Sequence, residues 1–125
     1  MTMQLAPELV VHRIGGGAIA NLRLKEAERG LQPPGISLLL GGTPSEAVGQ
    51  MRTAFPRSRK WMNAIDVGTA TVDEIRTLGF DVIPDPTTNF ANHARLIHAE
   101  GVTGFADENL ARLAKAFQST VEDQS

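Results

Sequence analysis

Two histidines and an arginine lie close together in the segment HARLIH at positions 93–98. The alternation of apolar and polar residues predicts a strand in which His93 and Arg95 share one face and His98 points to the other. An imidazole beside a guanidinium suits proton transfer next to a bound anion, so His93 and Arg95 are candidate catalytic residues. A polar outer face of an edge strand is the alternative. Because the two histidines face opposite ways, no metal site is expected.

A further cation lies inside an apolar segment near the amino terminus. His12 and Arg13 interrupt the sequence LVVHRI, where an unpaired buried charge is costly. Arg13 is therefore expected either to extend to solvent at the strand end or to face a cleft and bind an anion through its guanidinium. Gly15 and Gly16 follow directly, and their main-chain N–H groups are candidates for binding a ligand phosphate.

Two more polar residues are candidates for a site. Ser37 lies in the apolar run ISLLL, but no G-x-S-x-G pattern surrounds it, so a nucleophile is not indicated. It is expected to hydrogen-bond its neighbours or, in a cleft, to support a substrate hydroxyl. Glu100 precedes Gly101 at a predicted turn, where it is either an exposed residue or a catalytic carboxylate.

Capping motifs and periodicity predict the elements that position these residues. The sequences TPSE at 43–46 and TVDE at 71–74 are capping boxes that begin two helices, and a third helix begins near Asp107. Strands are expected at 9–14, 36–40, 80–83 and 93–98, with a weaker one at 21–24. We therefore predict an α+β fold, with a compact, partly antiparallel sheet and three small flanking helices.

Length and composition limit the classes of protein. The 125 residues fit one globular domain over residues 1–118, followed by a frayed tail at 119–125. No cysteine is present, which excludes disulfides and thiolate chemistry. A net charge of −2 gives no general attraction to nucleic acid, and no apolar run is long enough to span a membrane. No signal peptide is recognised, so a cytoplasmic location is expected, in the producing cell or in a target bacterial cell.

Several segments, in order, resemble a known group of proteins. VVHRIGGG, PPGISLLLGGTPSEAVGQM, GFDVIPDPT and NHARLIHAEGVTGF are similar to small bacterial ADP-ribosyltransferase-like toxin domains, including type VI secretion effectors and C-terminal modules of polymorphic toxins. The resemblance implies a split-barrel fold that acts on NAD by transfer or hydrolysis. It implies that Arg13 or His12 grips NAD and that Ser37 supports the ribose site. A later carboxylate would activate the ribose, with Glu100 the nearest candidate.

The resemblance also implies partners, while the residues alone leave other classes open. A toxin of this group is expected to have a cognate antitoxin or immunity protein and a macromolecular target. One alternative is a metal-independent ribonuclease toxin, in which His93 and Arg95 cleave RNA through its 2′-hydroxyl. The other is a non-catalytic module that neutralises a toxin or serves interaction, in which His12 and Arg13 are structural.

Overall fold

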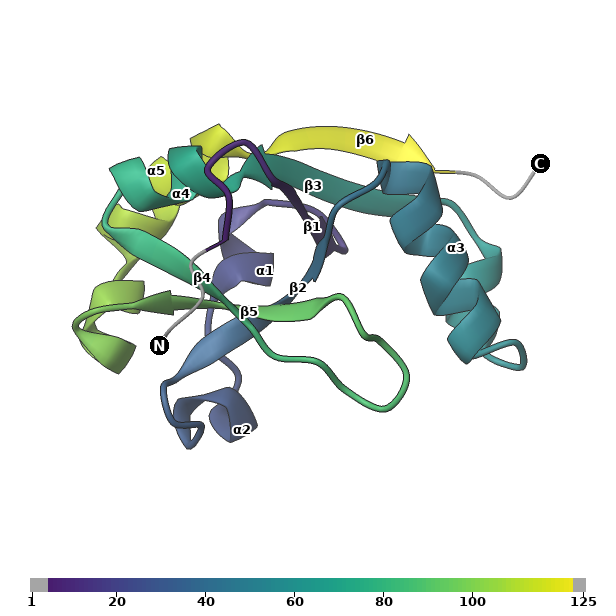
Figure 1. Cartoon of the computed structure of the whole chain (residues 1–125), viewed down its shortest axis with the longest axis horizontal. Helices are drawn as coiled ribbons and strands as arrows, with labels where there is room; N and C mark the ends of the chain where they lie inside the picture. Colours follow the sequence, from purple (N-terminus) through teal and green to yellow (C-terminus); the bar gives the residue numbers. More distant parts are fainter. Residues whose placement is uncertain (1–4, 123–125) are drawn as a thin grey trace.

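A computed structural model describes residues 5–122 of the chain (Figure 1). Over these residues, six strands form one sheet in the order β4-β5-β2-β1-β3-β6, and all neighbours are antiparallel. The strands are β1 (Val10–Ile14), β2 (Gly35–Leu40), β3 (Ile65–Thr71), β4 (Phe80–Pro84), β5 (His93–His98) and β6 (Gln118–Glu122). The predicted α+β class is confirmed. The sheet is open, with β4 and β6 at its edges, and does not close into a barrel.

Five α-helices and two 3₁₀ helices accompany the sheet in the described part of the chain. They are α1 (Ile19–Leu22), α2 (Glu26–Arg29), α3 (Pro44–Ala54), η1 (Arg59–Met62), α4 (Val72–Thr77), η2 (Gly101–Phe105) and α5 (Asp107–Ala116). The three predicted helices are α3, α4 and α5, and both capping boxes are formed. At α3 the Thr43 hydroxyl accepts the Glu46 N–H at 3.1 Å, and the Glu46 carboxylate accepts the Thr43 N–H at 3.0 Å. Helices α1 and α2 are too short to show a periodic pattern.

Two expectations about the elements are wrong, and the sequence predicts neither β3 nor β6 as a strand. The weak strand at 21–24 does not form, because Asn21 and Leu22 complete α1 and Leu22 enters the core. Residues 119–122 are not frayed but pair with β3 as part of β6, whereas 123–125 lie outside the described residues. Strand β3 contains Gly68 and two threonines, so its sequence lacks the sustained apolar pattern that predicts a strand.

The sheet divides into two halves that share only a short junction. Strand β1 pairs with β3 over its whole length, from Val10 to Ile14, but with β2 only at Val11 and His12. Beyond His12 the strands separate, and β2 from Gly35 onward runs alongside β5 instead. In Figure 1, β3 and β6 lie in the upper part of the molecule and β4 and β5 below, with β1 and β2 between them. This division creates space beside β1.

Apolar side chains fill both faces of the sheet. The larger core joins one face of the strands to α1, α4 and α5, and a smaller core of Val48, Trp61, Ile65 and Val67 packs α3 and η1 against the other face. Val11 belongs to the larger core, while Ile14 packs against the smaller one, so β1 is covered on both sides as its sequence predicts. Within residues 5–122 no helix has the length and apolar character to cross a membrane.

Candidate functional site

A cavity of about 650 Å³ opens where β1 and β2 separate. This volume is in the range of small-molecule sites. Its walls come from the two separating strands, α2, the region of η1, and loop 85–92 between β4 and β5. The loop is held to α3 by the side-chain amides of Gln50 and Asn92, which donate to each other at 2.9 and 3.0 Å. Five of the residues predicted from the sequence line the cavity: His12, Arg13, Gly15, Ser37 and His93.

Arg13 is a buried cation in the cavity wall, with 7% of its surface exposed. Its Nε and Nη2 donate to the main-chain oxygen of Asn21 at 2.9 and 2.7 Å, and Nη1 donates to that of Ser37 at 2.9 Å. Among the described residues, no carboxylate lies within ion-pair distance of it. Burial lowers the pKa of Arg13, and the charge of Glu28 partly opposes that shift. Arg13 therefore faces the cleft rather than extending to solvent.

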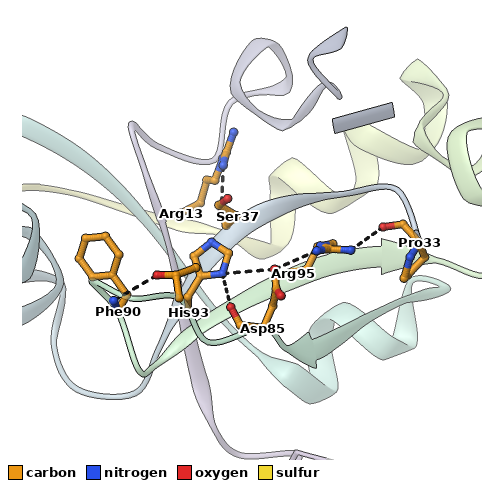
Figure 2. A network of polar contacts seen from close by, with 8 residues as sticks. Arg13, Pro33, Ser37, Asp85, Phe90, His93 and Arg95 are labelled. Atoms are coloured by element: carbon orange, nitrogen blue, oxygen red, sulfur yellow. Dashed lines mark hydrogen bonds and ion pairs between the residues drawn. The ribbon is translucent and has the colours of Figure 1, made fainter. Parts of the chain in front are cut away.

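Ser37 meets the cavity from the adjacent strand β2. Its carbonyl oxygen is occupied by Arg13, while its side chain is exposed. Register places Ser37 opposite Arg95 of β5, and the next pair along the same face is Leu39 with His93. Ser37 and His93 are therefore diagonal neighbours on the cavity face of the sheet, and Figure 2 shows both with Arg13. All three residues line the same cavity.

His93, Asp85 and Arg95 form a connected polar group (Figure 2). His93 Nδ1 lies 2.7 Å from the main-chain oxygen of Asp85 and 3.5 Å from its Oδ2. Arg95 Nη2 donates to the same Oδ2 at 2.9 Å, and Nη1 donates to the main-chain oxygen of Pro33 at 2.9 Å. His93 lines the cavity, but Arg95 does not. The predicted pair is thus brought together through Asp85, with Arg95 behind the imidazole.

His12 is adjacent to the cavity but already fully engaged by the fold. It is completely buried, with Nδ1 2.9 Å from the Thr69 hydroxyl. Its Nε2 lies 3.0 Å from the main-chain oxygen of Gly41 and 3.1 Å from that of Gly42. Neither ring nitrogen is left to bind a cofactor. The arrangement corresponds to the structural alternative for His12 and corrects the cofactor-binding assignment.

The glycines after β1 are also occupied. Gly15 and Gly16 have positive φ, at 97° and 99°, which explains why glycine stands there. The Gly15 N–H donates to the Asp66 carbonyl at 2.7 Å, and the Gly16 N–H to the Arg13 carbonyl at 3.2 Å. Only Gly15 lines the cavity. The Gly15 amide therefore continues the pairing with β3 and the Gly16 amide closes a turn, so both of the donors predicted for a phosphate already have main-chain partners.

Glu100 does not line the cavity. It is exposed at the turn after β5, where its N–H donates to His98 Nδ1 at 3.0 Å. His98 packs against Phe80 on the face opposite His93, as the alternation predicts. Two other carboxylates, Glu28 and Asp66, lie in the cavity wall. They are the acids available to a ligand there.

Cationic and aromatic side chains complete the walls. Lys25 and Lys60 line the cavity, and the Lys60 ammonium lies 4.8 Å from the Trp61 ring centre. Trp61 of η1 and Phe90 of loop 85–92 supply aromatic surface to the cavity. A site that combines cations with aromatic surface suits an anionic ligand that carries a planar ring.

Sequence reasoning missed several of these residues. The sequence PDP at 84–86 suggests a turn, but β4 runs through Pro84 and the Asp85 N–H still bonds to the His93 carbonyl. Nor does this sequence indicate that Asp85 contacts two residues of the next strand. Glu28 and Asp66 lie in segments with no motif, so only the fold brings them to Arg13.

Neither metals nor relatives add to this description. Within residues 5–122, no group of three or more histidine, aspartate or glutamate side chains could hold a metal ion. Comparisons of the chain with protein-family models, with curated proteins and with solved structures find no match.

Proposed function

We propose that the chain is a bacterial toxin domain that acts on NAD, by transfer of ADP-ribose or by hydrolysis. One observation carries this proposal. Arg13 of β1 and Ser37 of β2, the residues that the resemblance assigns to the NAD site, are directly hydrogen-bonded and line the same cavity. The two residues are far apart in the sequence, so their contact results from the fold.

The arrangement of the sheet supports a likeness to the split-barrel fold of ADP-ribosyltransferases. Its two halves meet only at Val11 and His12, and the cavity opens where they part. In this proposal NAD occupies the gap between the halves. The open edges at β4 and β6 mean that the likeness concerns the division of the sheet, not closure into a barrel.

The charge and shape of the cavity agree with a dinucleotide. Arg13 carries a buried charge that no described carboxylate neutralises, so a bound pyrophosphate would offset the cost of its burial. Three of the five guanidinium N–H groups are used by the protein, which leaves two for a ligand. Trp61 and Phe90 offer surface for a base or a nicotinamide ring, and Ser37 offers a hydroxyl to a ribose.

The proposed chemistry requires a carboxylate near the ribose. The bond between C1′ of the nicotinamide ribose and the pyridinium nitrogen breaks, and its electron pair goes to that nitrogen. A negative side chain stabilises the positive charge that develops at C1′. Glu100 is outside the cavity, so this role falls to Glu28 or Asp66. Water or a hydroxyl of the target then bonds to C1′ and releases a proton.

The test is incubation of the purified full chain with NAD, following release of nicotinamide and loss of NAD. We expect turnover by the wild type, a large loss in Arg13→Lys, and a smaller loss in Ser37→Ala. Arg23→Lys is the matched control, because Arg23 is an exposed arginine paired with Asp107 outside the cavity. A folded wild-type chain that neither binds nor consumes NAD contradicts the proposal.

RNA cleavage is the second candidate, favoured by the position of His93. Its ring faces the cavity together with Lys25 and Lys60, which is sufficient for proton transfer beside a phosphate. Incubation with total bacterial RNA separates the two candidates. Cleavage that is absent in His93→Gln, without NAD turnover, supports the ribonuclease.

The toxin assignment has its own test. Induction of the chain in a bacterial host should slow growth and lower cellular NAD, and Arg13→Lys should relieve both effects. A cognate immunity protein is then expected to restore growth. Normal growth, with no turnover of NAD or RNA, favours the non-catalytic interaction module instead.

A further inference from the structure

We propose that His93 is the general base of the cavity, and that Asp85 and Arg95 are the residues that position it. Its activity test rests on the proposed function, whereas its spectroscopic test does not. The inference assigns a defined tautomer to His93, with Nδ1 protonated and the lone pair of Nε2 directed into the cavity.

The first step concerns the proton on Nδ1. The main-chain oxygen of Asp85, 2.7 Å away, can only accept a hydrogen bond, so Nδ1 must donate. In a neutral imidazole only one nitrogen carries a hydrogen. Nε2 of His93 is then a hydrogen-bond acceptor and a proton acceptor.

Nε2 of His93 is accessible. Among the described residues, His93 Nε2 has no hydrogen-bond partner, while every buried side-chain nitrogen or oxygen has one. Nε2 is therefore not sealed in the protein, although only 15% of the side chain is exposed. The surface that His93 exposes lies in the cavity wall, diagonally across from Ser37.

Asp85 and Arg95 hold the imidazole ring of His93 in place. The main chain of Asp85 makes two hydrogen bonds to His93. Its carbonyl oxygen accepts from the imidazole Nδ1, and its N–H donates to the His93 carbonyl oxygen at 2.9 Å. Its carboxylate is fixed by Arg95, which is in turn anchored to the Pro33 carbonyl. The imidazole is thus held by Asp85, whose own carboxylate is held by Arg95. Such support is what a proton acceptor needs in order to act on a bound molecule.

In the proposed step, a water or an acceptor hydroxyl in the cavity bonds to C1′ after the bond from C1′ to nicotinamide has broken. The proton of that nucleophile passes to His93 Nε2, and the imidazolium stays hydrogen-bonded to Asp85 through Nδ1. Release of the proton to solvent restores the base. In this scheme His93 performs the proton transfer, and the cavity carboxylate stabilises C1′.

The other two histidines provide internal references. His12 Nε2 faces two carbonyl oxygens and must carry the hydrogen. His98 Nδ1 accepts the Glu100 N–H, so its hydrogen is also on Nε2. His93 is therefore predicted to have the opposite tautomer to both.

A long-range ¹H–¹⁵N spectrum of the labelled full chain tests this prediction without any substrate. We expect the unprotonated nitrogen signal of neutral His93 to be Nε2, and that of His12 and His98 to be Nδ1. Diethyl pyrocarbonate, which acylates accessible unprotonated imidazole nitrogens, should modify the peptide that contains His93 and spare that of His12. A hydrogen on His93 Nε2, or no reaction at His93 in the folded chain, overturns the inference.

The catalytic role is tested with matched variants in the NAD assay. His93→Gln should lower kcat on the order of 100-fold or more with little change in KM. His98→Gln is the control, since it makes the same substitution on the other face of β5. Asp85→Ala should lower kcat about tenfold, and Asp85→Asn, which keeps an oxygen for Arg95, should recover part of that loss. Full activity of His93→Gln overturns the role as base, whereas an inactive wild type refutes the NAD function and leaves the spectrum to decide the tautomer.

Discussion

Arg13 Nη1 donates to the carbonyl oxygen of Ser37 over 2.9 Å, across the gap where β1 and β2 have separated. In a continuous sheet a main-chain N–H of the neighbouring strand would serve that oxygen. The guanidinium takes over this task and at the same time binds Asn21 on α1. One side chain therefore spans the divided sheet and lines the cavity that the division creates.

Replacement of Arg13 by lysine should destabilise the fold. A single ammonium group cannot reach the carbonyls of Asn21 and Ser37 with the same planar geometry, so buried acceptors lose their donors. We expect a decrease of about 2–3 kcal/mol in the free energy of unfolding, measured by urea denaturation. Arg23→Lys, at an exposed ion pair, should change it by less than about 0.5 kcal/mol. Equal effects of the two variants would refute the bridging role.

An anion in the cavity should stabilise the chain through Arg13. Burial lowers the pKa of Arg13 in the folded state, so the unfolded chain holds this proton more tightly. The lowered pKa reduces the free energy of unfolding by its full amount at any pH below the pKa of Arg13 in the folded chain. This loss of stability disappears only at strongly alkaline pH. A bound phosphate raises the pKa again. ADP-ribose at about 100 times its Kd should raise the free energy of unfolding by about 2.7 kcal/mol, which is measured as a higher Tm. Adenosine at the same concentration should raise it less, because it has no phosphate for Arg13. The same shift in Arg13→Lys would contradict this account.

His12 should stabilise the folded chain through hydrogen bonds within the protein. His12→Ala removes three hydrogen bonds to Thr69, Gly41 and Gly42 at a fully buried position. The free energy of unfolding should fall by about 2–4 kcal/mol in thermal or urea denaturation. Ser37→Ala, at an exposed side chain of the same cavity, serves as the comparison and should change stability by less than about 0.5 kcal/mol.

Two glycine substitutions should have opposite effects. A Cβ at Gly17 would lie 2.3 Å from Cβ of Phe117, so Gly17→Ala should destabilise the chain by more than about 1 kcal/mol. A Cβ at Gly49, inside α3, would meet no atom within 4 Å. Gly49→Ala should therefore stabilise the chain by about 0.5–1 kcal/mol, because alanine favours the helix. Circular dichroism melts of the two variants give the comparison, and a stable Gly17→Ala would show that this packing is looser than described.

The sequence predicts the local elements better than their assembly. Capping boxes at Thr43 and Thr71 locate two helices because the signal is contained in four residues. Strands β3 and β6 escape prediction, since Gly68 and two threonines interrupt the apolar residues of β3, and the exposed β6 is held by its main-chain pairing with β3. The exposed Val121 in β6 illustrates this, with 64% of its surface accessible.

The site shows the same limit. The cost of an unpaired charge in an apolar strand singles out Arg13, and period-two alternation separates His93 from His98. Neither signal reveals that Asp85 joins His93 to Arg95, because that contact depends on the register of β4 against β5. The hydrogen bonds that occupy His12 and Gly15 escape prediction for a related reason, since their partners come from distant segments.

The reciprocal amide bonds of Gln50 and Asn92 attach loop 85–92, one wall of the cavity, to α3. A change at either position leaves the other amide with an unused donor and acceptor, so the two are expected to vary as a pair in descendants of this chain. Because Arg13, Ser37 and His93 do not contribute to that pair, substitutions at Gln50 and Asn92 can alter the attachment of the loop without changing these three side chains.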